Sequence, residues 1–154
     1  MVQIQEGLAA LQTTGAVGVW RPYFLTLLAE AAAQAGEPDE GIHRLNEAQT
    51  LLENTGECWW ETEVHRLHGE LLWRHARADA SQAETRFLQA LAVARRQQAK
   101  SLELRAATSL ARLWQQQGRR AEAHQLLAES YGWFTEGFDT ADLQEARALL
   151  QALA

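Results

Sequence analysis

The stretch RPYFLTLLAEAAAQAGEPDEGIHRLNEAQTLLENTG, residues 21–56, decides the fold. Its first half places Leu25, Leu28 and other apolar residues three or four positions apart, which is the spacing of one face of an α-helix. Gly36 and Pro38 then interrupt the pattern. Glycine commonly follows a helix, and proline is tolerated in a first helical turn. A second apolar stripe with the same spacing follows, so the stretch predicts two helices joined by a short turn.

Small residues recur along the whole chain at nearly fixed spacing. The first series, 40 and 42 residues apart, is Ala29, Gly69 and Ala111. The second series, which follows the first by 12, 14 and 12 residues, is Gly41, Ala83 and Ala123. Small side chains let two helices approach closely, so each pair predicts the crossing point of one helical hairpin. Repetition at this period is typical of a solenoid, whose units bury their apolar faces by stacking on one another.

We therefore expect an all-α fold, a right-handed α-solenoid that forms one domain over residues 1–154. Its predicted parts are a partial repeat helix at 2–13, helical hairpins at 20–56, 59–98 and 101–134, and a capping helix at 139–153. Pro22 and Pro38 are expected to mark helix starts. Because residues 2–13 parallel the end of the first hairpin, we expect a half-repeat there, cut from a longer protein. The alternative is a short helix that caps the array by itself.

Composition excludes several classes of function. The formal net charge of −6 argues against a nucleic-acid partner, since such proteins usually carry a basic face. No apolar run approaches the ~20 residues that span a bilayer, and the N-terminus lacks the pattern of a secretory signal. The single cysteine, Cys58, fits a reducing compartment. We expect a cytoplasmic protein with neither nucleic-acid nor membrane partners.

Motifs for chemistry are missing from the sequence. It contains no phosphate-binding loop, dinucleotide fingerprint or nucleophile elbow, so we expect no catalytic residues, no cofactor and no metal. The nearest approach to a site is Cys58 with Glu61, His65 and His68, of which the last three share one helix face. A metal hydrolase there is one hypothesis. The histidines are three residues apart rather than four, and other units have leucine or alanine at these positions, which favours packing with some pH sensitivity.

The six tryptophans raise a similar choice between ligand stacking and packing. Five of them are expected to fill gaps between units, because aromatic side chains bury large areas: Trp20, Trp59, Trp60, Trp114 and Trp133. Trp73 differs, because its helical phase points away from the packing face of Gly69.

The three units resemble tetratricopeptide repeats. The residues that match the second helix of that family are Ala83, Phe87, Ala90 and Leu91. Gly41 stands where alanine is usual, and Ser130 in the third unit stands where the second has Ala90. The spacing of 40 to 42 residues also exceeds the common repeat of 34. Longer helices of this kind are similar to the sensor arrays of bacterial signalling ATPases, including the maltose-regulon activator type.

Three strings resemble the C-terminal end of large bacterial multidomain proteins, in which a class III adenylate/guanylate cyclase-like or DNA-binding domain precedes an ATPase domain and then the repeats. They are RPYFLTLLAE at 21–30, AKSLELRAATSLARLW at 99–114 and YGWFTEGFDTADLQEARALL at 131–150. The resemblance implies a regulatory segment of a signal-transduction protein. It carries no cyclase or ATPase residues onto this chain, so we expect no enzyme activity from it.

The resemblance also implies a working surface, because the first helices of tetratricopeptide hairpins line a concave wall. The residues opposite the small-residue crossings are Tyr23, Thr26, Glu30, Glu63, Arg66, Glu70, Trp73, Arg74, Arg105, Thr108, Arg112, Gln115 and Gln116. Four arginines against three glutamates make this predicted wall more basic than the whole chain. Arginine with an exposed tryptophan is common among partner anchors, so Arg66, Arg105, Arg112 and Trp73 are the expected anchors. The alternative is a solvated helix face with salt bridges such as Glu70–Arg74.

The sequence thus favours a non-catalytic module that binds a protein, a peptide or a neighbouring domain of its parent chain. One alternative is a free-standing adaptor. Another is a self-associating module, in which an apolar end around residues 2–20 drives homo-oligomers.

Overall fold

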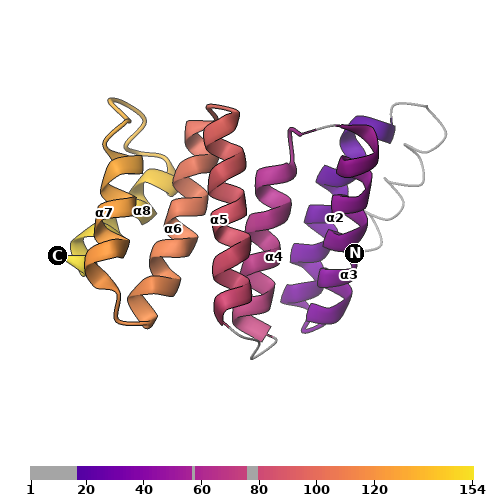
Figure 1. Ribbon diagram of the computed structural model, residues 1–154, viewed down its shortest axis with the longest axis horizontal. Coiled ribbons are helices and arrows are strands. Elements are labelled where there is room, and N and C mark those ends of the chain that lie inside the picture. The colour runs from indigo at the N-terminus through magenta and orange to yellow at the C-terminus, as the bar shows by residue number, and fades with distance from the viewer. Residues whose placement is uncertain (1–16, 57, 76–79) are drawn as a thin grey trace.

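The computed structural model describes residues 17–56, 58–75 and 80–154, and their regular structure is entirely α-helical. The helices stand side by side in a row, with α2 and α3 at one end and α7 and α8 at the other (Figure 1). They are α2 (Val17–Gln34), α3 (Pro38–Thr55), α4 (Glu61–His75), α5 (Ala80–Arg96), α6 (Lys100–Gln116), α7 (Arg120–Tyr131) and α8 (Ala141–Leu153). The all-α prediction is therefore confirmed. The helix predicted at 2–13 lies outside the described residues.

Glycine ends the helices where the sequence predicts. Gly36 and Gly118 adopt left-handed backbone with φ of 82° and 80°, a conformation that costs glycine little. The position of Pro22 was predicted wrongly, because α2 begins at Val17 and the proline lies inside the helix. Its fixed φ is compatible with a helix, but inside the helix it removes one backbone hydrogen bond and its ring crowds the carbonyl group four residues earlier. The last helix begins at Ala141, two residues later than expected, after Thr140 in extended backbone.

The small residues mark close approaches in the first two units. A Cβ atom added at Gly41 would lie 2.8 Å from Leu71 Cδ1 and 3.0 Å from the carbonyl oxygen of Ala29. A Cβ added at Gly69 would lie 2.7 Å from the ring of Phe87. Glycine at both positions therefore lets neighbouring helices pack more closely than alanine would allow.

The apolar core is divided at α4. One large cluster joins α5, α6, α7 and α8 around Phe87, Leu110 and Leu127. Two smaller clusters join α2, α3 and α4, and they include Val64 and Leu71 of α4. The other buried side chains of α4 are largely polar: Thr62, Glu63, His65, Arg66, His68 and Glu70. This helix thus presents apolar residues to α2 and α3 and buries polar groups on its other sides.

The two sides of the row are packed differently. Among the described helices, the backbones of α2, α4, α6 and α8 each approach the next in this series closely, whereas the backbones of α3, α5 and α7 do not approach one another closely. Neighbouring helices are therefore more crowded on the side of α2, α4, α6 and α8. None of the described helices is long and apolar enough to span a membrane.

The prediction that tryptophans fill the gaps between units is wrong for three of them. Trp20 is 50% exposed, Trp59 is 73% exposed and Trp133 is 59% exposed. Trp60 does pack, with its ring centroid 4.6 Å from that of Tyr23. Trp114 is half-buried, and its Nε1 donates a hydrogen bond of 2.7 Å to Glu84. Tryptophans near helix ends thus reach solvent, which helical periodicity alone does not predict.

Candidate partner-binding cleft

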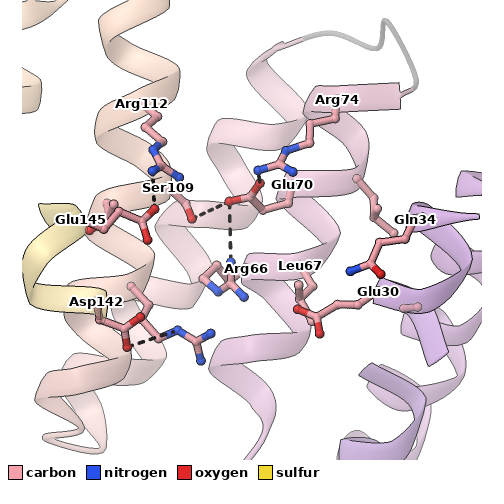
Figure 2. Close-up of a pocket in the computed structure, with 15 residues that line it drawn as sticks. Glu30, Gln34, Arg66, Leu67, Glu70, Arg74, Ser109, Arg112, Asp142 and Glu145 are labelled. Atoms are coloured by element: carbon pink, nitrogen blue, oxygen red, sulfur yellow. Dashed lines mark hydrogen bonds and ion pairs between the residues drawn. The ribbon is translucent and has the colours of Figure 1, made fainter. Parts of the chain in front are cut away.

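A cleft of about 350 Å³ opens on the side of the row formed by α2, α4, α6 and α8 (Figure 2). Seven of the residues predicted for the concave wall line it: Glu30, Arg66, Glu70, Arg74, Arg105, Thr108 and Arg112. The helical phase of α2, α4 and α6 brings these side chains together, since residues three and four apart share one face. Ala29, Ala33, Leu67 and Leu71 form the apolar part of the lining.

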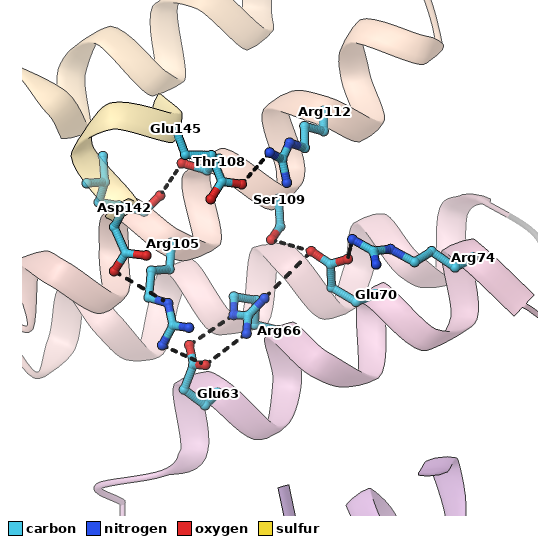
Figure 3. Close-up of polar contacts among 11 residues, drawn as sticks. Glu63, Arg66, Glu70, Arg74, Arg105, Thr108, Ser109, Arg112, Asp142 and Glu145 are labelled. Carbon is cyan, nitrogen blue, oxygen red and sulfur yellow. Dashed lines mark hydrogen bonds and ion pairs between the residues drawn. The ribbon is translucent and has the colours of Figure 1, made fainter. Parts of the chain in front are cut away.

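Arg66 lies at the centre of a buried ion-pair network (Figure 3). It is only 9% exposed, and its Nε and Nη2 donate hydrogen bonds of 3.0 and 2.9 Å to the two carboxylate oxygens of Glu63. Its Nη1 lies 3.6 Å from Glu70 Oε1. Burial by itself would lower the pKa of Arg66, but the hydrogen bond to Glu63 and the charges of Glu63, Glu70 and Glu30 raise it. Arg66 is therefore held as a fixed charge rather than presented as a free anchor.

Glu70 links α4 to α6. The hydroxyl of Ser109 donates a hydrogen bond of 2.7 Å to Glu70 Oε1, while Arg74 Nη2 lies 2.8 Å from Oε2 (Figure 3). Both carboxylate oxygens of this buried residue thus have a polar or charged neighbour, which offsets the cost of burying the charge.

The last helix supplies acidic groups that sequence reasoning missed. Arg105 lies 3.1 Å from Glu63 and 3.7 Å from Asp142 of α8, and Arg112 forms an ion pair with Glu145 of the same helix. Four arginines and four carboxylates consequently line the cleft. The lining is therefore balanced in charge, because α8, which was interpreted as a cap alone, adds two carboxylates to the predicted wall. The one available signal is that Asp142 and Glu145 are three residues apart and share a helix face.

Six predicted wall residues do not line the cleft, although Glu63 belongs to the network beside it. Thr26 is buried and its hydroxyl donates a 2.6 Å hydrogen bond to the carbonyl oxygen of Tyr23, whose ring packs on Trp60. Trp73 is half-buried against the large core cluster, so it is not the exposed anchor that its phase predicted. The others outside the lining are Gln115 and Gln116, in the last turn of α6.

The two histidines of α4 are buried beside a guanidinium group. His65 Nδ1 lies 3.3 Å from Arg86 Nη1, and the buried Nδ1 of His68 has no hydrogen-bond partner among the described residues. Burial, and then the charge of Arg86, lower the pKa of each histidine to about 4. A cation would be repelled by Arg86, and the described residues hold no group of three or more His, Cys, Asp or Glu side chains suited to a metal. The charge of Arg86 therefore disfavours a cation at His65 and His68.

Acid is expected to destabilise the protein through His65 and His68. An unfolded histidine has a pKa near 6.5, so between pH 6.5 and about 4 the unfolded chain binds protons that the folded chain does not. The stabilisation that depends on neutral His65 and His68 is then fully present above pH 6.5 and is lost as the pH is lowered. From pH 7.5 to 5.0 each histidine should remove about 2 kcal/mol of unfolding free energy, which urea denaturation would measure.

A double variant, His65→Gln with His68→Gln, should flatten this pH dependence. The matched control is His43→Gln, because His43 is exposed on α3. If the double variant and the control lost equal stability on acidification, the buried histidines would not be responsible.

The cleft combines a mixed-charge lining with a size that suits a few side chains of a ligand. Most of its described ionisable groups form ion pairs with one another, which fixes the positions of their side chains. A scan against models of known protein families finds no match to this chain, and a search of curated proteins finds no similar sequence.

Proposed function

We propose that this chain is a non-catalytic protein-interaction module whose cleft between α2, α4, α6 and α8 binds a peptide segment or a neighbouring domain. The observation that carries this proposal is the set of four arginines, from α4 and α6, that line one cleft of about 350 Å³. Arginine is enriched where proteins recognise partners. A mixed lining of arginines and carboxylates suits a partner segment that bears charges of both signs.

The proposed architecture is a right-handed solenoid of three tetratricopeptide-like hairpins with α8 as its cap. Two observations support it. The small residues Gly41 and Gly69 sit at close helix approaches, at the positions that the repeat spacing marks. The contacts among α2, α4, α6 and α8, without equivalent contacts among α3, α5 and α7, fit a row that curves toward its first helices.

The proposed setting is a regulatory segment of a bacterial signal-transduction protein in the cytoplasm, as the resemblance of residues 21–30, 99–114 and 131–150 implies. A free-standing adaptor would use the same cleft in the same way. In both settings α8 takes part in recognition, because its carboxylates hold Arg105 and Arg112 until a partner arrives.

Replacing Arg105 and Arg112 with alanine should weaken binding at the cleft at least about tenfold, since two anchor residues commonly carry more than 1 kcal/mol. The probe is a peptide selected from a random library on the wild-type protein, with its Kd measured by fluorescence anisotropy. A matched control, Arg95→Ala with Arg96→Ala, removes two arginines from α5, outside the cleft lining. Equal affinity in both double variants, or failure to select any peptide, would contradict the proposal.

Self-association remains the second candidate, and the exposed rings of Trp20 and Trp59 favour it. Most of the predicted apolar end at 2–20 lies outside the described residues. Sedimentation of the wild type and of a Trp20→Ser, Trp59→Ser variant decides this candidate, since a monomeric wild type at high concentration would dispose of it.

A further inference from the structure

A polar seam separates the two parts of the apolar core. On the α4 side it consists of Glu63, His65, Arg66, His68 and Glu70, and on the other side it consists of Arg86 from α5 with Arg105 and Ser109 from α6. The clusters of α2, α3 and α4 lie on one side of the seam, and the large cluster of α5 to α8 lies on the other.

Apolar contact across the seam is centred on Gly69. The ring of Phe87 lies so close to this glycine that a Cβ atom would be 2.7 Å from it. Leu72 and Trp73 of α4 also reach the large cluster, but both are only half-buried. The helices α4 and α5 pack closely, and Gly69 marks one tight apolar approach with the polar contact of His65 and Arg86 near it. The tight approach can serve as a pivot, and the polar contact is the part that can break.

The histidines occupy the α5 side of this pivot. His65 faces Arg86 at 3.3 Å, and Arg86 in turn donates a 3.0 Å hydrogen bond to Gln49 of α3. The other charged or titratable groups near His65 are Glu53 of α3, Glu61 of α4, Arg96 of α5 and Cys58. For His68, the neighbouring charges are those of Arg86 and His65. Two protonated imidazoles would thus join a guanidinium group in a buried space.

We propose that the polar seam is an acid-sensitive hinge, at which protonation of His65 and His68 beside Arg86 loosens α4 from α5 and lets α2–α4 move relative to α5–α8. The lowered pKa of both histidines supports this hinge, because it means that the closed arrangement resists their protonation. An open arrangement that hydrates the rings restores their ordinary pKa near 6.5. Protons therefore favour the open arrangement.

The seam also divides the cleft. Glu30, Arg66 and Arg74 line it from α2 and α4, whereas Arg112 and Glu145 line it from α6 and α8. Movement at the hinge would change the separation of the two sets of charges. The hinge itself stands without the proposed function, and only its effect on partner binding rests on that function.

The test measures distances between spin labels by electron–electron double resonance in a Cys58→Ser background, because Cys58 is exposed. One pair, Asn46→Cys with Gln89→Cys, spans the seam from α3 to α5. A reference pair, Gln89→Cys with Ala121→Cys, lies within α5 and α7. All three labelled positions are exposed.

Between pH 7.5 and 5.0 the open-to-closed ratio should rise by about 30-fold for each histidine that titrates. For the seam pair, we expect a second and longer distance between the two labels to appear as the pH is lowered. For the reference pair, we expect the distance to stay the same. The His65→Gln, His68→Gln variant should keep the short distance at both pH values. If that variant does not fold, Arg86→Gln serves instead. Loss of the guanidinium group should reduce the fraction of molecules that show the longer distance at pH 5.0.

Three results would overturn the hinge. The seam pair could keep one distance at both pH values, or both pairs could lengthen together, which would indicate global unfolding. The third is an unchanged acid response when the histidines or Arg86 are replaced. None of these readouts depends on a peptide, so the hinge and the proposed function fail independently.

Discussion

Replacing Arg66 with methionine is expected to lower the free energy of unfolding by about 3 kcal/mol, because the change leaves buried carboxylates without their main cation. Glu63 would lose two hydrogen bonds, and Glu70 would lose a charge 3.6 Å away. Breaking a buried ion pair on one side typically costs about 3–5 kcal/mol. The lower end applies here, since Arg105 and Arg74 still neighbour these carboxylates.

The matched control for this change is Arg74→Met. Arg74 contacts the same Glu70, but its side chain is 58% exposed, so its loss should cost less than about 1 kcal/mol. Urea denaturation at pH 7.5 compares the two variants. If both variants lost the same small amount of unfolding free energy, burial would not strengthen the ion pairs of Arg66 in the way that the geometry indicates.

Replacing Phe87 with alanine is expected to cost about 3–5 kcal/mol, the range for removing a large aromatic side chain from a packed core. Phe87 is fully buried, and its ring fills the space left by the missing side chain of Gly69. Truncation would leave a cavity at the contact between α4 and α5, and tight helix packing leaves little freedom to close it.

Phe138→Ala provides the comparison for Phe87→Ala, because it makes the same chemical change at a residue that is 43% exposed. We expect a loss below about 1 kcal/mol for this variant. Thermal unfolding followed by circular dichroism measures both. A loss at Phe138 as large as that at Phe87 would show that ring burial does not set the cost.

Local features of the fold could be predicted from the sequence. Apolar spacing located the helices, and Gly36 and Gly118 located turns, because both signals act within a few residues. Pro22 was misleading for the same local reason: its backbone angle suits a helix interior as well as a first turn. The partners of Asp142 and Glu145 could not be predicted, because they depend on how the chain from α7 to α8 returns toward α6.

Only part of the candidate site could be predicted, because helical phase is also a local signal. Helical phase placed Arg66, Arg105 and Arg112 on one side, and all three line the cleft. Helical phase does not reveal which neighbouring helix will cover a residue. It therefore predicted an exposed Trp73, whereas the large core cluster half-buries this side chain. It also did not show that Arg66 is held by Glu63 in the same helix, since surface and buried pairs have the same spacing.

The division of the apolar core at α4 bears on how the chain folds. A protein with one continuous core unfolds as a single unit, whereas stacked units with weak coupling can unfold separately. Residues of α5 to α8 share one apolar cluster, while the clusters of α2 and α3 depend on α4, so we expect two cooperative units rather than one. The polar face of α4 would then mark the boundary between these units, and we expect the strength of its ion pairs to decide whether they melt together or one after the other.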